Sequence, residues 1–211
     1  MKSMLSVKNL PDRLEPFPPG FCLQDTVEVA RGLIGAYLVS ETTAGIVAGR
    51  IVETEAYRED DPASHSYRGK AGRNLPMFAA GGIAYVYFIY GMYNCFNVVT
   101  EPEGVGCAVL IRAMEPVLNT GIMWSNRFPG KPFEPGLVGR IADGPGKLCR
   151  AMQITRVHNG LHLSAGPLRV LKDPNKPPPR VSVSRRIGIK RGEDLLWRFF
   201  DGDSPAVSRQ K

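Results

Sequence analysis

Residues 84–99 form a run of aromatic and β-branched side chains, interrupted at Gly91, and this run most restricts how the chain can fold. Such residues favour extended backbone, and a glycine among them marks a tight turn, so strands are predicted at 84–90 and 93–99. Other segments with strand-like composition are 36–41, 46–57 and 108–113. Because strand follows strand through hairpin-like links, we predict a curved, mainly antiparallel sheet rather than a doubly wound fold.

Short helices are expected at the periphery of this sheet. Asp25, followed by Glu28 in the spacing of a capping box, predicts a helix that runs to about Ile34. Further helices are predicted near 117–126 and 148–153. The expected fold class is therefore mixed α/β (α+β), with strands forming the framework.

The length of 211 residues and the hydrophobic content of 43% suffice for one well-packed domain. We place this domain at 21–203, after an N-terminal arm at 1–20 and before a frayed C-terminal tail at 204–211. No stretch resembles a signal peptide or a membrane span, and the 4 cysteines form no CxxC pair. These features favour an intracellular protein with reduced thiols.

The formal net charge of +7 fits a protein that binds nucleic acid through phosphate contacts. Arg68, Lys70 and Arg73 lie in a polar, glycine-containing segment and could meet such phosphates, although a solvated loop explains them equally well. Residues 144–147 precede a predicted helix, so free amides and Lys147 could contact a phosphate. An ordinary turn before a helix is the alternative.

A metal site is not expected. His158 and His162 have the i, i+4 spacing of a metal pair on a helix. However, Asn159 and Gly160 between them signal a turn, which favours separate surface histidines. We therefore predict neither a metal nor a cofactor.

The segment Glu53-Thr54-Glu55-Ala56-Tyr57 carries the candidate chemistry. In a strand, alternate side chains share a face, so Glu53, Glu55 and Tyr57 are predicted to point to the same side. This arrangement could set a carboxylate beside an aromatic wall. The alternative is an edge strand with a solvated acidic face. Glu53 itself is expected to be a structural or solvated acid.

Together with the rest of the chain, this segment resembles the alkyladenine (3-methyladenine) DNA glycosylase family, and by its compact length a bacterial member. The motifs that carry the resemblance are, in chain order, 50–57, 63–66, 73–74, 85–93, Asn97, 110–113, 144–149, 186–189 and 197–199. They span nearly the whole chain after about the first twenty residues. The resemblance implies a single mixed α/β domain like the C-terminal domain of a formyltransferase.

The resemblance also implies a base-excision-repair enzyme. Such an enzyme flips a damaged purine out of duplex DNA and hydrolyses its N-glycosidic bond with water, which leaves an abasic site. The expected lesions are 3-methyladenine, 7-methylguanine, hypoxanthine and ethenoadenine. By the same resemblance, Glu55 would deprotonate the attacking water and Arg112 would help to hold that water.

Other roles implied by the resemblance concern the flipped base. Tyr57, His65 and Tyr87 would form the walls around it, with His65 also bonding to the purine edge. Asn97 would crowd the exocyclic amine of ordinary guanine. Tyr85, Val86 and Phe88, in contrast, are expected to belong to the core, because aromatic stripes are more often core than binding site.

The expected partner is double-stranded DNA that contains damaged purines. Tyr90 would enter the duplex as a wedge with Met92 beside it, and Arg73 and Lys147 would contact DNA. We expect a monomer without membrane contact, located in the cytoplasm and associated with the nucleoid.

Two other function classes remain open at this level. A non-catalytic nucleic-acid-binding module would not require Glu55, and a hydrolase of free nucleosides would have little use for a projecting Tyr90. A lyase step is not expected, because no lysine accompanies Glu55 in its motif.

Overall fold

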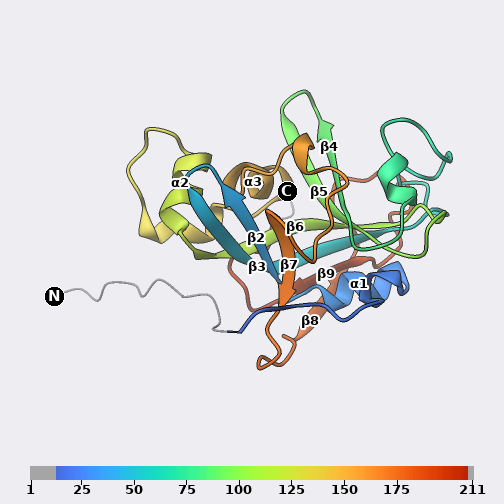
Figure 1. The fold of residues 1–211 in the computed structure, drawn as a ribbon, viewed down its shortest axis with the longest axis horizontal. Coiled ribbons are helices and arrows are strands. Elements are labelled where there is room, and N and C mark those ends of the chain that lie inside the picture. Colours follow the sequence, from blue (N-terminus) through green and yellow to red (C-terminus); the bar gives the residue numbers. More distant parts are fainter. Residues whose placement is uncertain (1–12, 209–211) are drawn as a thin grey trace.

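The computed structural model describes residues 13–208, which form one antiparallel sheet with short helices around it (Figure 1). Residues 1–12 of the expected arm and 209–211 of the expected tail lie outside the described residues. The strands are β1 (Glu15–Pro16), β2 (Tyr37–Thr42), β3 (Gly45–Tyr57), β4 (Ala84–Ile89), β5 (Tyr93–Val99), β6 (Ala108–Leu118), β7 (Leu168–Lys172), β8 (Val181–Ser184) and β9 (Arg198–Asp201).

The helices are short. They are α1 (Thr26–Gly32), α2 (Thr120–Arg127) and α3 (Pro145–Ala151), with 3-10 turns at Phe21–Leu23, Leu75–Phe78, Pro135–Arg140 and Arg156–His158. Among residues 13–208, no helix is both long and apolar enough to cross a membrane. In Figure 1, α1 lies at the lower right of the molecule and α2 at the upper left, with α3 beside α2 toward the centre.

The 13-residue strand β3 is the centre of the sheet. The strand order is β1-β7-β2-β3-β6-β5-β4, and β9 also pairs with β3 while β8 pairs with β9. β6 pairs with one edge of β3. The opposite edge pairs with β2 along the first half of β3 and with β9 along the second half. Irregular register between Ile51 and Thr54 marks a bulge where the two partners change.

The predicted mixed α/β class with a curled antiparallel sheet is confirmed, and the predicted hairpin coincides with β4 and β5. Asp25 caps α1 as expected, because its carboxylate accepts hydrogen bonds from the N–H groups of Val27 and Glu28. The helix predicted near 117–126 is present as α2, but it begins at Thr120 and not at residue 117. Residues 114–118 instead extend β6 along the beginning of β3. The likeness to a formyltransferase domain stays a prediction.

The C-terminal segment also differs from the expectation. Residues 204–208 do not fray, because Ala206 is fully buried against Val52 and Ala113 and the side chain of Ser204 donates to Glu115. The strands β7, β8 and β9 were not predicted. Each has only four or five residues, too few for a clear alternation of polar and apolar side chains.

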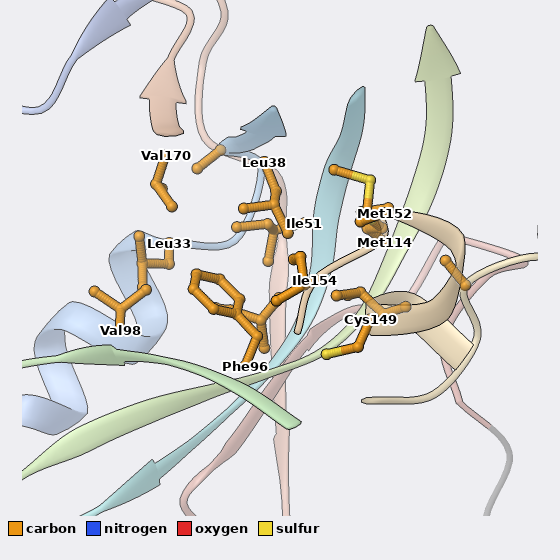
Figure 2. Packing of buried hydrophobic residues seen from close by; sticks show 14 of the residues in the cluster. Leu33, Leu38, Ile51, Phe96, Val98, Met114, Cys149, Met152, Ile154 and Val170 are labelled. Carbon is orange, nitrogen blue, oxygen red and sulfur yellow. The ribbon is translucent and has the colours of Figure 1, made fainter. Parts of the chain in front are cut away.

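The main core lies between the sheet and the helices. Figure 2 shows Phe96 of β5 between Leu33, which ends α1, and Ile154 and Cys149 on the α3 side. Phe96 is completely buried, and its neighbours Leu33 and Cys149 are each only 1% exposed. The core thus fixes the base of the β4–β5 hairpin, whose tip projects away from the body in Figure 1.

This packing predicts a large loss of stability for Phe96→Ala. Removing a buried phenylalanine ring leaves a cavity and should cost about 3–5 kcal/mol of unfolding free energy. Phe88→Ala is the matched control in the same hairpin, because Phe88 is 52% exposed and should change stability by less than about 0.5 kcal/mol. Urea denaturation of both variants measures the difference, and equal losses would contradict the assignment of the core.

Candidate active site

A cavity of about 560 Å³ lies between the end of β3, the β4–β5 hairpin, β6 and the start of α3. Its volume is within the range of small-molecule sites, about 300–1,000 Å³. The site residues predicted from sequence that line it are Tyr57, His65, Tyr87, Tyr90, Asn97, Arg112 and Lys147. Residues far apart in the chain therefore meet around one space, as the resemblance implied.

Glu55 lies one layer behind the cavity wall and is completely buried. Its Oε1 accepts a hydrogen bond of 2.7 Å from the backbone N–H of Ile187. Its Oε2 accepts bonds of 2.8 Å from the hydroxyl of Tyr57 and 3.1 Å from Nη1 of Arg112. Because Tyr57 and Arg112 both line the cavity, the carboxylate is held immediately behind two groups that a ligand would touch.

Tyr57 keeps its proton. Burial, followed by the neighbouring Glu55 carboxylate, raises the pKa of Tyr57 well above its usual value, so the phenol acts as a donor at neutral pH. The guanidinium of Arg186 lies 4.7 Å from the centre of its ring and is paired with the buried Asp61. The side chain is thus held on one side by a cation and at its hydroxyl by a carboxylate.

An aromatic cluster forms another part of the cavity wall. His65 Nδ1 lies 2.9 Å from the hydroxyl of Tyr85, and its ring meets that of Tyr87 edge to face at 4.5 Å between centroids. Burial and the nearby Arg73 lower the pKa of His65, which keeps the imidazole neutral at neutral pH. Burial raises the pKa of Tyr85 to about 12. The wall therefore consists of neutral aromatic rings.

The sequence predicted that Tyr85 belongs to the core, and the structure shows that it also contributes to the cavity. It is buried, but it also lines the cavity and holds His65. The signal was available, because strand alternation places Tyr85 on the same face as Tyr87. Phe88, which was also expected to be core, is instead exposed on the other face.

Asn97 is fixed at the floor of the cavity. It is 4% exposed, and its Nδ2 donates a 3.0 Å hydrogen bond to the backbone oxygen of Tyr85 across the β4–β5 pair. This bond uses one of the two N–H groups of the amide and fixes the orientation of the side chain at the cavity wall.

Tyr90 stands at the hairpin tip and is 79% exposed, yet it borders the cavity. Its φ of 53° and the φ of 66° at Gly91 are both left-handed, and these two residues form the centre of a turn closed by the hydrogen bond from the Met92 N–H to the Ile89 oxygen. Tyrosine adopts this conformation at a cost of about 1–2 kcal/mol. Met92 is exposed beside it but faces a neighbouring cavity formed with α3.

The predicted basic contacts lie at the rim. Lys147 lines the cavity, and its Nζ is 2.7 Å from the carboxylate of Asp143. Arg73 does not line this cavity but a third one beside it, together with Arg68 and Arg191. Arg191 was not anticipated, since it comes from a distant segment of the chain.

Two further cations at the rim were missed by sequence reasoning. Arg127, at the end of α2, and Arg150, near the end of α3, both line the cavity. Burial and the nearby Arg150 lower the pKa of Arg127. Neither belongs to a motif that singles it out, so only the packing of the two helices indicates this role.

Within residues 13–208, no three His, Cys, Asp or Glu side chains gather closely enough to hold a metal ion. The polar groups around Glu55 form hydrogen bonds with one another.

Comparison with known proteins places the chain in a family. Residues 20–205 match the family described as Methylpurine-DNA glycosylase (MPG). Similar proteins, each named "Putative 3-methyladenine DNA glycosylase", include one from Methanoculleus marisnigri, 45% identical over 92% of this chain and 98% of its own length. Others are from Methanocella arvoryzae, 48% identical over 92% and 96%, and from Chlorobium phaeobacteroides, 42% identical over 94% and 98%. This chain therefore belongs to the methylpurine-DNA glycosylase family, a family of DNA-repair hydrolases.

Proposed function

We propose that the protein flips alkylated or deaminated purines out of duplex DNA and hydrolyses their N-glycosidic bond with a water activated by Glu55. The substrates are 3-methyladenine, 7-methylguanine, hypoxanthine and ethenoadenine. The observation that carries the proposal is the buried Glu55 carboxylate, bonded to Tyr57 and Arg112 at the wall of an aromatic cavity. A non-catalytic binding module would have no need of this arrangement.

Base flipping is supported by the aromatic cavity and the exposed hairpin tip. Extruding a nucleotide costs a few kcal/mol, less for a damaged or mismatched base. Stacking on aromatic rings returns about 1–3 kcal/mol for the base, which Tyr57, Tyr87 and His65 can supply. Tyr90 can fill the space that the base leaves and so prevent the duplex from reclosing.

The walls also favour damaged purines over normal ones. Purines alkylated on a ring nitrogen are cationic, and the faces of Tyr57 and Tyr87 attract cations. The neutral imidazole of His65 adds no repulsive charge. Asn97 is fixed by its bond to Tyr85, and we assign to it the steric rejection of the exocyclic amine of guanine.

The chemical step requires one carboxylate. The oxygen of water attacks C1′ of the deoxyribose, its proton passes to Glu55, and the electron pair of the broken C–N bond leaves with the purine. Arg112 lines the cavity beside Glu55 and orients the water. Cationic lesions leave directly, whereas neutral lesions must also gain a proton.

The protein acts as a monofunctional glycosylase and as a monomer on damaged duplex DNA. Lys147 lines the cavity, but its Nζ is engaged by the carboxylate of Asp143 at 2.7 Å. Arg73, Met92 and Lys147 contact the DNA, and the site of action is the nucleoid in the cytoplasm.

Glu55→Gln should abolish excision while leaving DNA binding intact. Loss of a general base costs about 10²–10⁴-fold in rate, and glutamine preserves the shape of the buried site. The measurement is single-turnover cleavage of labelled duplexes containing hypoxanthine or ethenoadenine, and of methylated DNA, followed by alkali. Salt-sensitive binding without strand breaks by the native protein would favour the binding-module alternative.

Tyr90→Ala should weaken capture of the flipped base. Removal of an inserted aromatic ring costs about 1–3 kcal/mol, which corresponds to a loss of about 5- to 150-fold in excision at limiting enzyme. Val157→Ala is the control, because Val157 is equally exposed at 79% but does not line the cavity. Equal activity of the two variants would contradict the wedge role of Tyr90.

Treatment with borohydride during turnover should trap no covalent adduct between protein and DNA. A water nucleophile forms no Schiff base, whereas a lyase reaction through Lys147 would form one. A trapped adduct that disappears in Lys147→Met would show that the enzyme is bifunctional. The abasic product of the native enzyme should remain uncleaved until alkali is added.

A further inference from the structure

Glu53 is a completely buried carboxylate that the proposed reaction does not use. Its Oε1 accepts hydrogen bonds from Arg112 Nε at 3.1 Å, Arg198 Nε at 2.6 Å and Ser208 Oγ at 2.8 Å. Its Oε2 accepts a 2.7 Å bond from the backbone N–H of Ser208. Of the two expectations for Glu53, a structural or a solvated acid, the structure supports the structural one, because Arg112 of β6, Arg198 of β9 and Ser208 of the C-terminal segment hold the carboxylate.

The charges around Glu53 form a balanced set. Glu53 and Glu55 face Arg112 and Arg198, which gives two negative and two positive charges in a region where every one of these side chains is at most 9% exposed. Buried ion pairs are weak evidence for stability, because removing two charges from water offsets most of their attraction. A reason for the cluster other than stability is therefore needed.

The guanidinium of Arg112 supplies that reason. Its Nε donates to Glu53 and its Nη1 donates to Glu55 Oε2, so one rigid planar group joins the two carboxylates. If one edge of the plane is anchored, the direction of the other edge is fixed as well. Arg112 also lines the cavity, so its orientation determines which of its N–H groups faces Glu55 and which faces a bound water.

We propose that Glu53 is a positioning residue that orients Arg112 against Glu55. The C-terminal segment takes part, because Ser208 and Arg198 fix the Glu53 carboxylate and the backbone oxygen of Ser208 accepts a hydrogen bond from Nη2 of Arg198. Residues 204–208 therefore belong to the support of the active site. The inference rests on the proposed function of Glu55 as the base.

The test compares two variants that separate charge balance from positioning. Glu53→Gln replaces the charged anchor with a neutral amide that can accept at only one oxygen, and it leaves the cluster with an excess positive charge. Glu53→Gln combined with Arg198→Met makes the same replacement but restores neutrality. Single-turnover excision of hypoxanthine or ethenoadenine, duplex affinity and melting temperature are measured for both and for the native protein.

Both variants are expected to excise about 10–100-fold more slowly, because a misplacement of about 1 Å in an active site can cost about 10²-fold. Duplex affinity should stay within about threefold of native, since the wedge and the rim are untouched. Only the double variant should recover the melting temperature. Recovery of the excision rate together with the melting temperature would overturn the inference, since Glu53 would then be only structural.

Asp201→Asn is the matched control. Asp201 lies on β9 in the same sheet and pairs with the largely buried Arg50 at 2.9 Å, and neither residue is hydrogen-bonded to Arg112. This variant should lower the melting temperature and leave the excision rate unchanged. A rate loss equal to that of Glu53→Gln would overturn the inference, because any broken buried pair would then have the same effect.

Ser208→Ala decides the question if the Glu53 variants do not fold. It removes the Oγ bond to Glu53 and keeps the backbone bond. A fall in excision rate of about threefold at a native melting temperature supports positioning, and an unchanged rate overturns it. An inactive native protein would overturn the proposed function as well, whereas an active native protein with an active Glu53→Gln would overturn only this inference.

Discussion

Arg112 donates one hydrogen bond to Glu53 and another to Glu55, and the strands that pair with β3 bring these three side chains together. β6 brings the arginine to one edge of β3, and β9 closes the opposite edge beside the two carboxylates. Charges buried in this way must be satisfied nearly completely, because an unpaired one is costly. The requirement explains why short C-terminal segments return to the centre of the sheet.

The cavity combines this rigid charged wall with a projecting aromatic one. Tyr85 and Tyr87 lie on β4, and His65 reaches them from the loop before it. At the end of the same hairpin, the left-handed backbone at Tyr90 presents an exposed ring next to the cavity. A core residue, Phe96, anchors the hairpin at its base. Binding surface and core are thus opposite faces of one strand pair.

Local rules predicted the parts of the fold that they govern. Alternation along β3 correctly placed Glu53, Glu55 and Tyr57 on one face. Arg112 donates hydrogen bonds to both carboxylates, and the hydroxyl of Tyr57 donates one to Glu55. The turn at Gly91 was equally local. The strands β7 to β9 were missed, because their few residues become strands only by pairing with partners already in place.

The sequence by itself determined which residue types are available, their order, and which of them share a strand face, because these depend on neighbours a few positions apart. Only the tertiary structure decided that Ile187 donates to Glu55 and Ser208 to Glu53, across separations of 132 and 155 residues. It also buried Glu55 behind the cavity wall and made Glu53 a bound anion rather than a solvated one. Such contacts arise from the pairing of distant strands, which no local pattern encodes.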